Sequence, residues 1–175
     1  MKQGIAERRT ISNSRIPSKI QNQARLGALF IKPGFFPLDP WGNPFQDNLE
    51  SLIHSLDIDV VATNELSLTE EEVKKVYYGI FETDKPSETL KRVRDNLMQY
   101  LAGAPIRCYL LAGDDVMTKI GVIKKTVRRQ YGFVKGGSDV KSIVHTPEPE
   151  DVMHDVNTFF LYRPNNEELL KRIWE

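Results

Sequence analysis

Short apolar segments of strand length alternate with longer amphipathic segments along most of this 175-residue chain. The apolar run 28–31 stops at a Lys-Pro-Gly sequence, which is typical of a buried strand. Helical segments instead repeat their apolar residues every three or four positions, as Phe45, Leu49 and Ile53 do. The pattern predicts strand 28–31, helix 44–56, strand 58–64, helix 70–80, helix 87–102, strand 106–111, helix 116–125, strand 142–145, helix 146–160 and a final helix 167–174.

This order corresponds to two βαβ-type halves. Such halves predict an α+β fold, a ferredoxin-like αβ sandwich with a four-stranded antiparallel sheet covered by helices on one face. Local signals set the helix ends. Asn43 is the expected N-cap before Pro44, Thr69 and Glu72 form a capping box, and Gly103 ends the helix 87–102.

Composition and charge exclude several classes of protein. Basic and acidic residues are both 24, so the chain is not a generally basic nucleic-acid binder. Cys108 is the only cysteine, which excludes an intrachain disulfide and a cysteine-based zinc site. The chain contains no apolar run of about 20 residues and no secretory signal, so we expect no membrane association and a cytoplasmic location.

The first 25 residues differ from the rest in charge. They hold six basic residues against one acidic residue, a net charge of +5, and few large apolar side chains. We therefore predict two parts, a basic flexible arm at 1–25 and one folded domain at 26–175. The arm is either solvated or a binding site for polyanions.

One histidine stands where chemistry is possible. His145 ends a predicted strand just before a helix start, Lys32 ends another strand, and Arg128 and Arg129 lie in an expected loop. A neutral imidazole can attack phosphorus, while nearby cations offset the charge of a phosphoryl group. The alternative is a histidine that is only solvated or hydrogen-bonded.

The stretch 25–160 resembles the nucleoside diphosphate kinases. Residues 28–33 are similar to the family's first strand and its Lys-Pro turn, and 96–105 to its helix that ends in a small-Gly-Pro step. Ile143-Val144-His145, an acid-rich helix start and then 155–160 are similar to the segment with the phosphorylated histidine. The helix from Asn43 and the strand 58–64 follow in the family's order.

The resemblance implies a ping-pong transfer of the γ-phosphate of a nucleoside triphosphate to a diphosphate, with Mg²⁺ on the phosphates and no protein metal site. His145 matches the nucleophile, Lys32 the lysine on the transferring phosphate, and Tyr77 the tyrosine near the histidine. Asp155 matches the glutamate that orients the imidazole, although it is one carbon shorter. Thr126 and Arg128 match a phosphate-holding Thr-x-Arg, with Arg129 as the alternative.

Several positions depart from the family pattern. The long loop before the Thr-x-Arg is largely absent, which removes subunit contacts of the homo-oligomer that the family implies. Lys119, Lys124 or Lys125 replaces an arginine, and Val93 stands where the base-stacking phenylalanine is expected. Ser142 replaces the asparagine before the histidine, and Thr146 supplies a hydroxyl after it. The Gly-rich segment 132–141 either folds over a nucleotide or forms a plain hairpin.

Three functions follow for testing. The first is an active phosphotransferase with the catalytic residues His145, Asp155 and Lys32. The second is a catalytically weak or inactive relative that binds nucleotides or acts in assembly. The third is an RNA-binding module, although strand-borne aromatic residues typical of RNA-recognition domains are not evident.

Overall fold

The computed structural model describes residues 25–131 and 143–163. The predicted arm therefore lies outside the described residues apart from Arg25, as do the segment 132–142 and the helix expected at 167–174. The elements are β1 (Leu26–Ile31), α1 (Phe45–Ser55), β2 (Asp59–Ser67), α2 (Glu70–Val76), α3 (Tyr78–Phe81), α4 (Glu88–Leu101), β3 (Pro105–Ala112), α5 (Val116–Tyr131), β4 (Val144–His145), the 3₁₀ turn η4 (Pro149–Asp151), α6 (Val152–Val156) and the π-helical turn η5 (Asn157–Leu161).

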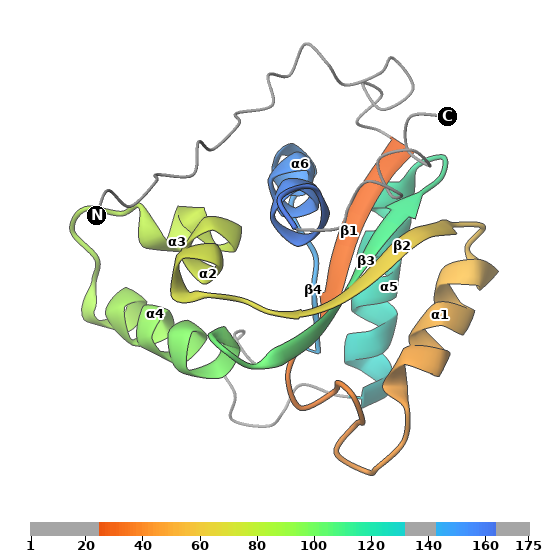
Figure 1. Ribbon diagram of the computed structural model, residues 1–175, viewed down its shortest axis with the longest axis horizontal. Coiled ribbons are helices and arrows are strands. Elements are labelled where there is room, and N and C mark those ends of the chain that lie inside the picture. The colour runs from red at the N-terminus through yellow and green to blue at the C-terminus, as the bar shows by residue number, and fades with distance from the viewer. Residues whose placement is uncertain (1–24, 132–142, 164–175) are drawn as a thin grey trace, which may run out of the picture.

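The four strands form one antiparallel sheet in the order β2-β3-β1-β4 (Figure 1). Leu26 of β1 faces Ala112 of β3, and Phe30 of β1 faces His145 of β4. This topology confirms the predicted ferredoxin-like α+β fold. It also places the short strand that ends in His145 directly beside the strand that precedes Lys32.

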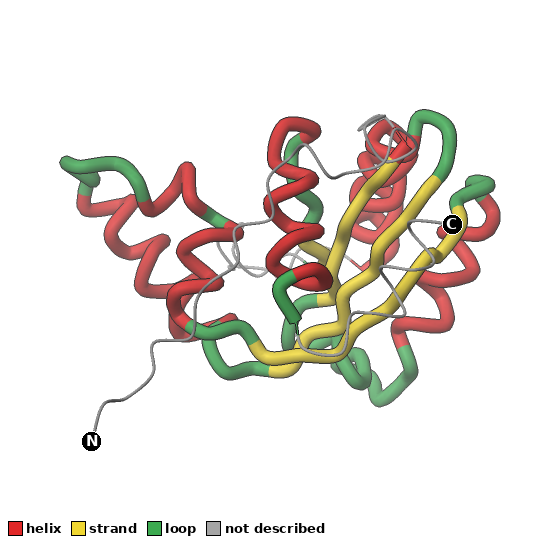
Figure 2. Tube along the Cα trace, turned by 45° about the horizontal axis from the view of Figure 1, so that its top comes forward, coloured by secondary structure: helices red, strands yellow, loops and turns green. Residues whose placement is uncertain are grey.

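Helices cover both faces of the sheet, so the prediction of helices on one face was wrong (Figure 2). Ala28 and Phe30 of β1 pack with residues of α2, α4, α6 and η5 on one side. Leu29 and Ile31 point the other way and pack with α1 and α5. Every residue of β1 is buried. A strand that carries apolar side chains on both faces requires a three-layer arrangement, which its uninterrupted apolar run already indicated.

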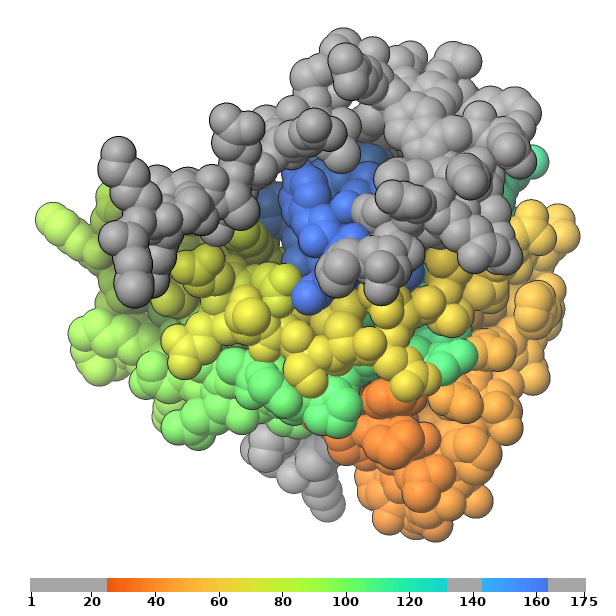
Figure 3. All heavy atoms as spheres, viewed as in Figure 1, coloured from red at the N-terminus to blue at the C-terminus, as the bar shows by residue number. Residues whose placement is uncertain are grey.

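β2 forms one edge of the sheet and lies on the molecular surface, as the yellow band in Figure 3. Exposed and partly buried residues alternate regularly only in the second half of β2, where Thr63, Glu65 and Ser67 are exposed. A register shift between Val60 and Ala62 interrupts the alternation in the first half. Asn64 of this strand donates a hydrogen bond to the carbonyl of Phe159 at 3.0 Å, which fixes η5 against the sheet.

The capping box at Thr69 and Glu72 is present as predicted, but two other helix ends differ. Pro44 rather than Asn43 is the N-cap of α1. The Asn43 amide is instead bonded to Oδ1 of Asp39 at 2.8 Å, in a turn that precedes the helix. The helix expected to open at Thr146 begins later, with η4 at Pro149. Among the described residues, no helix is long and apolar enough to cross a membrane.

Gly27 allows α5 to pack closely on β1. A Cβ atom there would collide with Cδ1 of Ile120 and lie 3.1 Å from Cγ2 of Val116, both buried. We expect Gly27→Ala to lower the free energy of unfolding by about 1–3 kcal/mol, the usual cost of overpacking. Gly121→Ala on α5 is the control, because its Cβ would meet no atom within 4 Å. Urea unfolding midpoints measure both, and an unchanged midpoint for Gly27→Ala would contradict the close approach.

Candidate functional site

The pairing of β1 with β4 brings His145 and Lys32 together. His145 pairs with Phe30, and the Lys32 amide donates to the carbonyl of Ile143 at 2.9 Å. Alternate residues of a strand share a face, so Lys32 lies on the same face as Phe30 and its partner His145. The imidazole stacks on the Phe30 ring, with centroids 4.7 Å apart. The two residues predicted to act together thus meet at one end of the sheet.

Asp155 holds the imidazole of His145 in a defined orientation. Oδ2 of Asp155 lies 2.9 Å from Nε2 of His145, and the Asp155 side chain is 1% exposed. A carboxylate only accepts hydrogen bonds, so Nε2 carries the proton and Nδ1 carries the lone pair. Within the described residues, Nδ1 has no hydrogen-bond partner. The shorter aspartate side chain therefore does reach the histidine.

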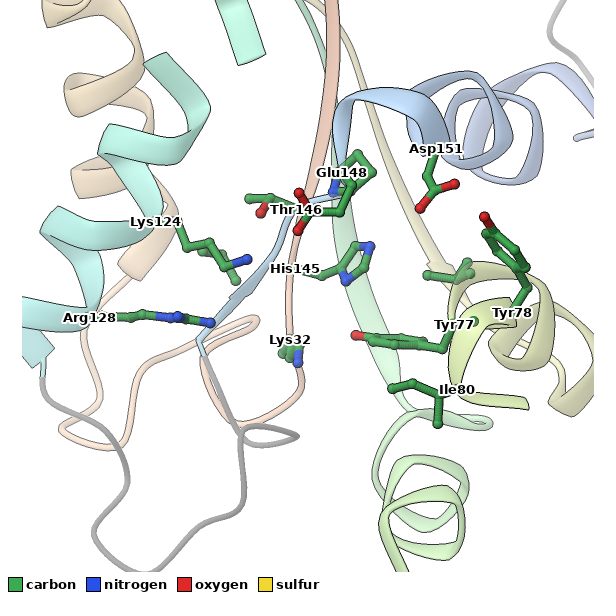
Figure 4. A pocket seen from close by; sticks show the side chains of 14 residues that line it. Lys32, Tyr77, Tyr78, Ile80, Lys124, Arg128, His145, Thr146, Glu148 and Asp151 are labelled. Atoms are coloured by element: carbon green, nitrogen blue, oxygen red, sulfur yellow. The ribbon is translucent and has the colours of Figure 1, made fainter. Parts of the chain in front are cut away.

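Tyr77 lies at a break between two helices. The sequence predicted one helical stripe over 70–80, but α2 ends at Val76 and α3 begins at Tyr78. The break leaves Tyr77 with φ −114° and ψ 34°, and its ring centroid lies 4.8 Å from that of His145. Figure 4 shows its hydroxyl directed into the space between His145 and Lys32. Tyr77 is therefore a site residue as well as a core contact.

The Tyr77 hydroxyl is buried and has no hydrogen-bond partner among the described residues. Burial raises the pKa of Tyr77 well above its ordinary value, and the negative charge of Asp155 raises it further. The hydroxyl therefore stays protonated at neutral pH and remains a donor. A buried donor without a partner costs free energy, which a ligand oxygen in the cavity would recover.

These side chains border a cavity of about 390 Å³, here called the reaction pocket (Figure 4). Cationic side chains line one part of it, Lys32 from the end of β1 and Lys124 and Arg128 from α5. Residues four apart on a helix share a face, which explains why Lys124 and Arg128 both line the cavity. Asp151 and Tyr78 border the opposite part (Figure 4). The cavity therefore has a cationic side and an acidic side, with His145 between them.

The cavity volume lies within the range of small-molecule sites. The His145 side chain is 11% exposed, so a ligand can reach it while most of the ring remains fixed. A nucleophilic nitrogen, a buried hydroxyl donor and three cations are the groups that a phosphoryl group requires. The arrangement can bind a polyphosphate and can accept a phosphoryl group on Nδ1.

Comparisons with known proteins agree with this architecture. No protein-family model and no curated protein matches the chain. Solved structures do. They include an NDP kinase from Pyrobaculum aerophilum (16% identity, 81% of this chain and 97% of that one, TM-score 0.59), the nucleoside diphosphate kinase of Borrelia burgdorferi with vanadate and ADP (17%, 81% and 89%, 0.58) and that of Aquifex aeolicus (15%, 77% and 93%, 0.53).

The chain has the nucleoside diphosphate kinase fold. Within this fold, the structure brings together five of the residues that the sequence pointed to. His145, Lys32, Tyr77, Arg128 and Thr146 all line the reaction pocket. Asp155 lies behind His145 and touches the pocket only through it. Lys124, one of the three lysines considered in place of an arginine, also lines the cavity.

The segment around Arg128 differs from its prediction. α5 continues to Tyr131, so Thr126, Arg128 and Arg129 are helical and do not lie in a loop. Thr126 lies two residues from both Lys124 and Arg128, on another side of the helix, and it does not line the pocket. Arg129 is exposed and also outside it. Arg128 is therefore the residue of this segment that faces the pocket.

Other predicted residues lie elsewhere. Lys119 donates from Nζ to the carbonyl of Asp57 at 3.0 Å, outside the reaction pocket. Lys125 is exposed and does not line it either. Val93 packs partly buried against the core beside the sheet. Ser142 lies outside the described residues.

Sequence reasoning missed the acidic side of the pocket. Asp151 lies in the stretch that the sequence marks only as an acid-rich helix start, and no sequence pattern singles out Tyr78. Asp151 raises the pKa of the Tyr78 hydroxyl, chiefly through a hydrogen bond. Asp151 lies six residues after His145 and Tyr78 directly follows Tyr77, and this closeness in sequence was the signal that could have placed them at the site. Tyr100 was missed too; its hydroxyl donates to the carbonyl of Pro33 and fixes the turn after Lys32.

Proposed function

We propose that this protein is a phosphotransferase that moves the γ-phosphate of a nucleoside triphosphate to a nucleoside diphosphate through a phosphohistidine at His145. The observation that carries the proposal is the hydrogen bond of 2.9 Å between Asp155 and Nε2 of His145. It leaves the Nδ1 lone pair for a ligand in a cavity lined by Lys32, Lys124 and Arg128. The Borrelia burgdorferi kinase, which has the same fold, is described with bound vanadate and ADP, and this supports a phosphate ligand here.

In the first half-reaction the Nδ1 lone pair of His145 attacks the γ-phosphorus. The new N–P bond forms as the bond between that phosphorus and the β,γ-bridging oxygen breaks, and the nucleoside diphosphate leaves with the electron pair. The ring gains positive charge, which Asp155 stabilises through the proton on Nε2. In the second half-reaction a terminal oxygen of another diphosphate attacks the phosphorus and the N–P bond breaks.

The cationic side chains supply the electrostatic part of this step. Lys32 is 2% exposed, so its charge acts where little water screens it. Lys124 and Arg128 face the same cavity, and the Tyr77 hydroxyl, which has no hydrogen-bond partner among the described residues, would donate to an oxygen of the transferring phosphate. Mg²⁺ is part of the proposal as an ion bound to the nucleotide phosphates, where it offsets their charge. A homo-oligomeric assembly is also proposed, and sedimentation of the full chain tests it.

The test is to mix the full-length protein with γ-labelled ATP and Mg²⁺ and to recover the protein. We expect covalent label that acid removes and alkali preserves, since that stability distinguishes a phosphoramidate from a phosphoester. Addition of unlabelled nucleoside diphosphates should transfer the label to triphosphates and so define the acceptors. Absence of label, with ADP binding intact by calorimetry, would contradict phosphoryl transfer and favour a nucleotide-binding module.

Tyr77→Phe isolates one donor in the pocket. The ring and its contact with His145 are retained, while the buried hydroxyl is removed. One hydrogen bond to a charged group is worth about 1.5–3 kcal/mol, so we expect the label to form about tenfold or more slowly. Tyr78→Phe, which removes a hydroxyl on the acidic side, should change the rate by less. Equal effects of the two variants would contradict the assignment of the Tyr77 hydroxyl as a hydrogen-bond donor to the phosphate.

A further inference from the structure

A second cavity of about 410 Å³ adjoins the reaction pocket. It lies between residues 117–128 of α5 and the segment 146–149, and we call it the side pocket. The two cavities share Lys124 and Arg128 of α5 and Thr146, Pro147 and Glu148 of the segment after β4. A ligand long enough to leave the reaction pocket on this side therefore enters the side pocket directly.

Charge sets the direction in which a polyphosphate extends from His145. The α5 side carries Lys124 and Arg128 with one carboxylate, Glu148, a net charge of +1, whereas Asp151 makes the side of α3 and α6 negative (Figure 4). A phosphate chain is attracted to the first side and repelled from the second. The chain thus extends from His145 toward α5, and the part of the nucleotide beyond the phosphates reaches the shared wall.

The side pocket differs from the reaction pocket in its chemistry. Beyond the shared wall its apolar lining is Met117, Ile120 and Gly121 of α5 with Pro149, and Thr118 and Lys125 of α5 complete it. Ile120 and Pro147 are buried, so these surfaces are fixed. Apolar, preformed walls suit a flat heterocycle better than a phosphate. Glu148 at the boundary can accept hydrogen bonds from sugar hydroxyls.

From this arrangement we infer that the side pocket binds the nucleoside part of the substrate, with the base over the first half of α5. The inference rests on the proposed function for the identity of the ligand. It assigns the phosphates to the cationic part of the reaction pocket and the base to the surface formed by Met117, Ile120 and Gly121. Gly121 is the key position, because a Cβ there would meet no atom within 4 Å.

Gly121→Leu fills the side pocket from its floor and tests the inference. The affinity of the full-length protein for ADP and for inorganic tripolyphosphate is measured by calorimetry, which needs no phosphoryl transfer. We expect the affinity for ADP to fall by about tenfold or more, because the leucine side chain would occupy the space of the base. Tripolyphosphate, which has no nucleoside, should bind within about threefold of wild type.

Three further variants make the result decisive. Val122→Leu is the matched control, since Val122 is 44% exposed and lines neither cavity. Thr118→Phe narrows the same pocket from an exposed position, should Gly121→Leu alter the thermal unfolding. Gly79→Leu fills the reaction pocket at the α3 end, where a Cβ would also meet no atom within 4 Å.

Each result of these binding measurements either supports or overturns the assignment of the side pocket. Selective loss of ADP affinity in Gly121→Leu and Thr118→Phe supports the side pocket. Equal loss of ADP and tripolyphosphate, no loss of either, or a larger loss of ADP affinity in Gly79→Leu overturns it, as does absence of ADP binding to the wild type. Selective loss of ADP affinity in a protein that never forms phosphohistidine would support the inference and contradict the proposed phosphotransferase.

Discussion

His145→Ala is expected to abolish covalent labelling by γ-labelled ATP, while the two other histidine variants retain it. The sequence contains three histidines, so the set is small enough to test completely. Only His145 combines a carboxylate partner on one ring nitrogen with a cavity beside the ring. Without a nucleophile, the cations of the pocket have no atom on which to place the phosphoryl group.

His54→Ala and His154→Ala are the matched controls. His54 is exposed on α1, and His154 is exposed on α6, where its ring lies 5.9 Å from that of Tyr78. Neither lines the reaction pocket. We expect both variants to label at the wild-type rate within about twofold. Label that persists in His145→Ala, or disappears in His154→Ala, would contradict the assignment of the nucleophile.

The fold was predictable because its strands and helices carry clear periodic patterns. The apolar runs in β1 and β3 and the stripe of Phe45, Leu49 and Ile53 on α1 sufficed for the order of elements. The number of layers was predicted wrongly. The apolar run 28–31 places apolar side chains on both faces of β1, and this pattern favours cover on both faces over a one-sided sheet.

The central part of the site was also predictable, since it depends on strand pairing. Lys32 and His145 end strands that an antiparallel sheet places side by side, and Asp155 follows on a helix ten residues later. The periphery was not predictable. The face that Arg128 presents depends on α5 continuing to Tyr131, and the position of Tyr77 depends on a helix break. The glycines nearby, Gly132 directly after α5 and Gly79 two residues after Tyr77, fix neither the face of α5 nor the position of the break.

Asp155→Asn should slow phosphohistidine formation by between about 10²- and 10⁴-fold while leaving the fold intact. The two side chains have nearly the same shape, so the buried position keeps its packing. The amide, unlike the carboxylate, both donates and accepts. Nε2 of His145 can then either donate a hydrogen bond to the amide oxygen or accept one from the amide nitrogen. In the molecules where Nε2 accepts, the proton of the neutral imidazole is on Nδ1, and Nδ1 cannot attack the phosphorus. The positive charge that develops on the ring also loses its partner.

Comparison of the ADP affinity with the rate of phosphohistidine formation separates an effect of Asp155 on the imidazole from a purely structural role. Asp155 does not line the reaction pocket, so the affinity for ADP by calorimetry should stay within about threefold of wild type. Glu150→Gln, an exposed carboxylate on η4 that lies outside the pocket, controls for loss of charge near the site. If Asp155→Asn instead weakened ADP binding and slowed labelling to the same extent, or lowered the unfolding midpoint sharply, Asp155 would support the fold of the segment 143–163. A slow rate with unchanged affinity requires that Asp155 acts on the imidazole itself, because the position of the proton between Nδ1 and Nε2 is then the property that the substitution changes.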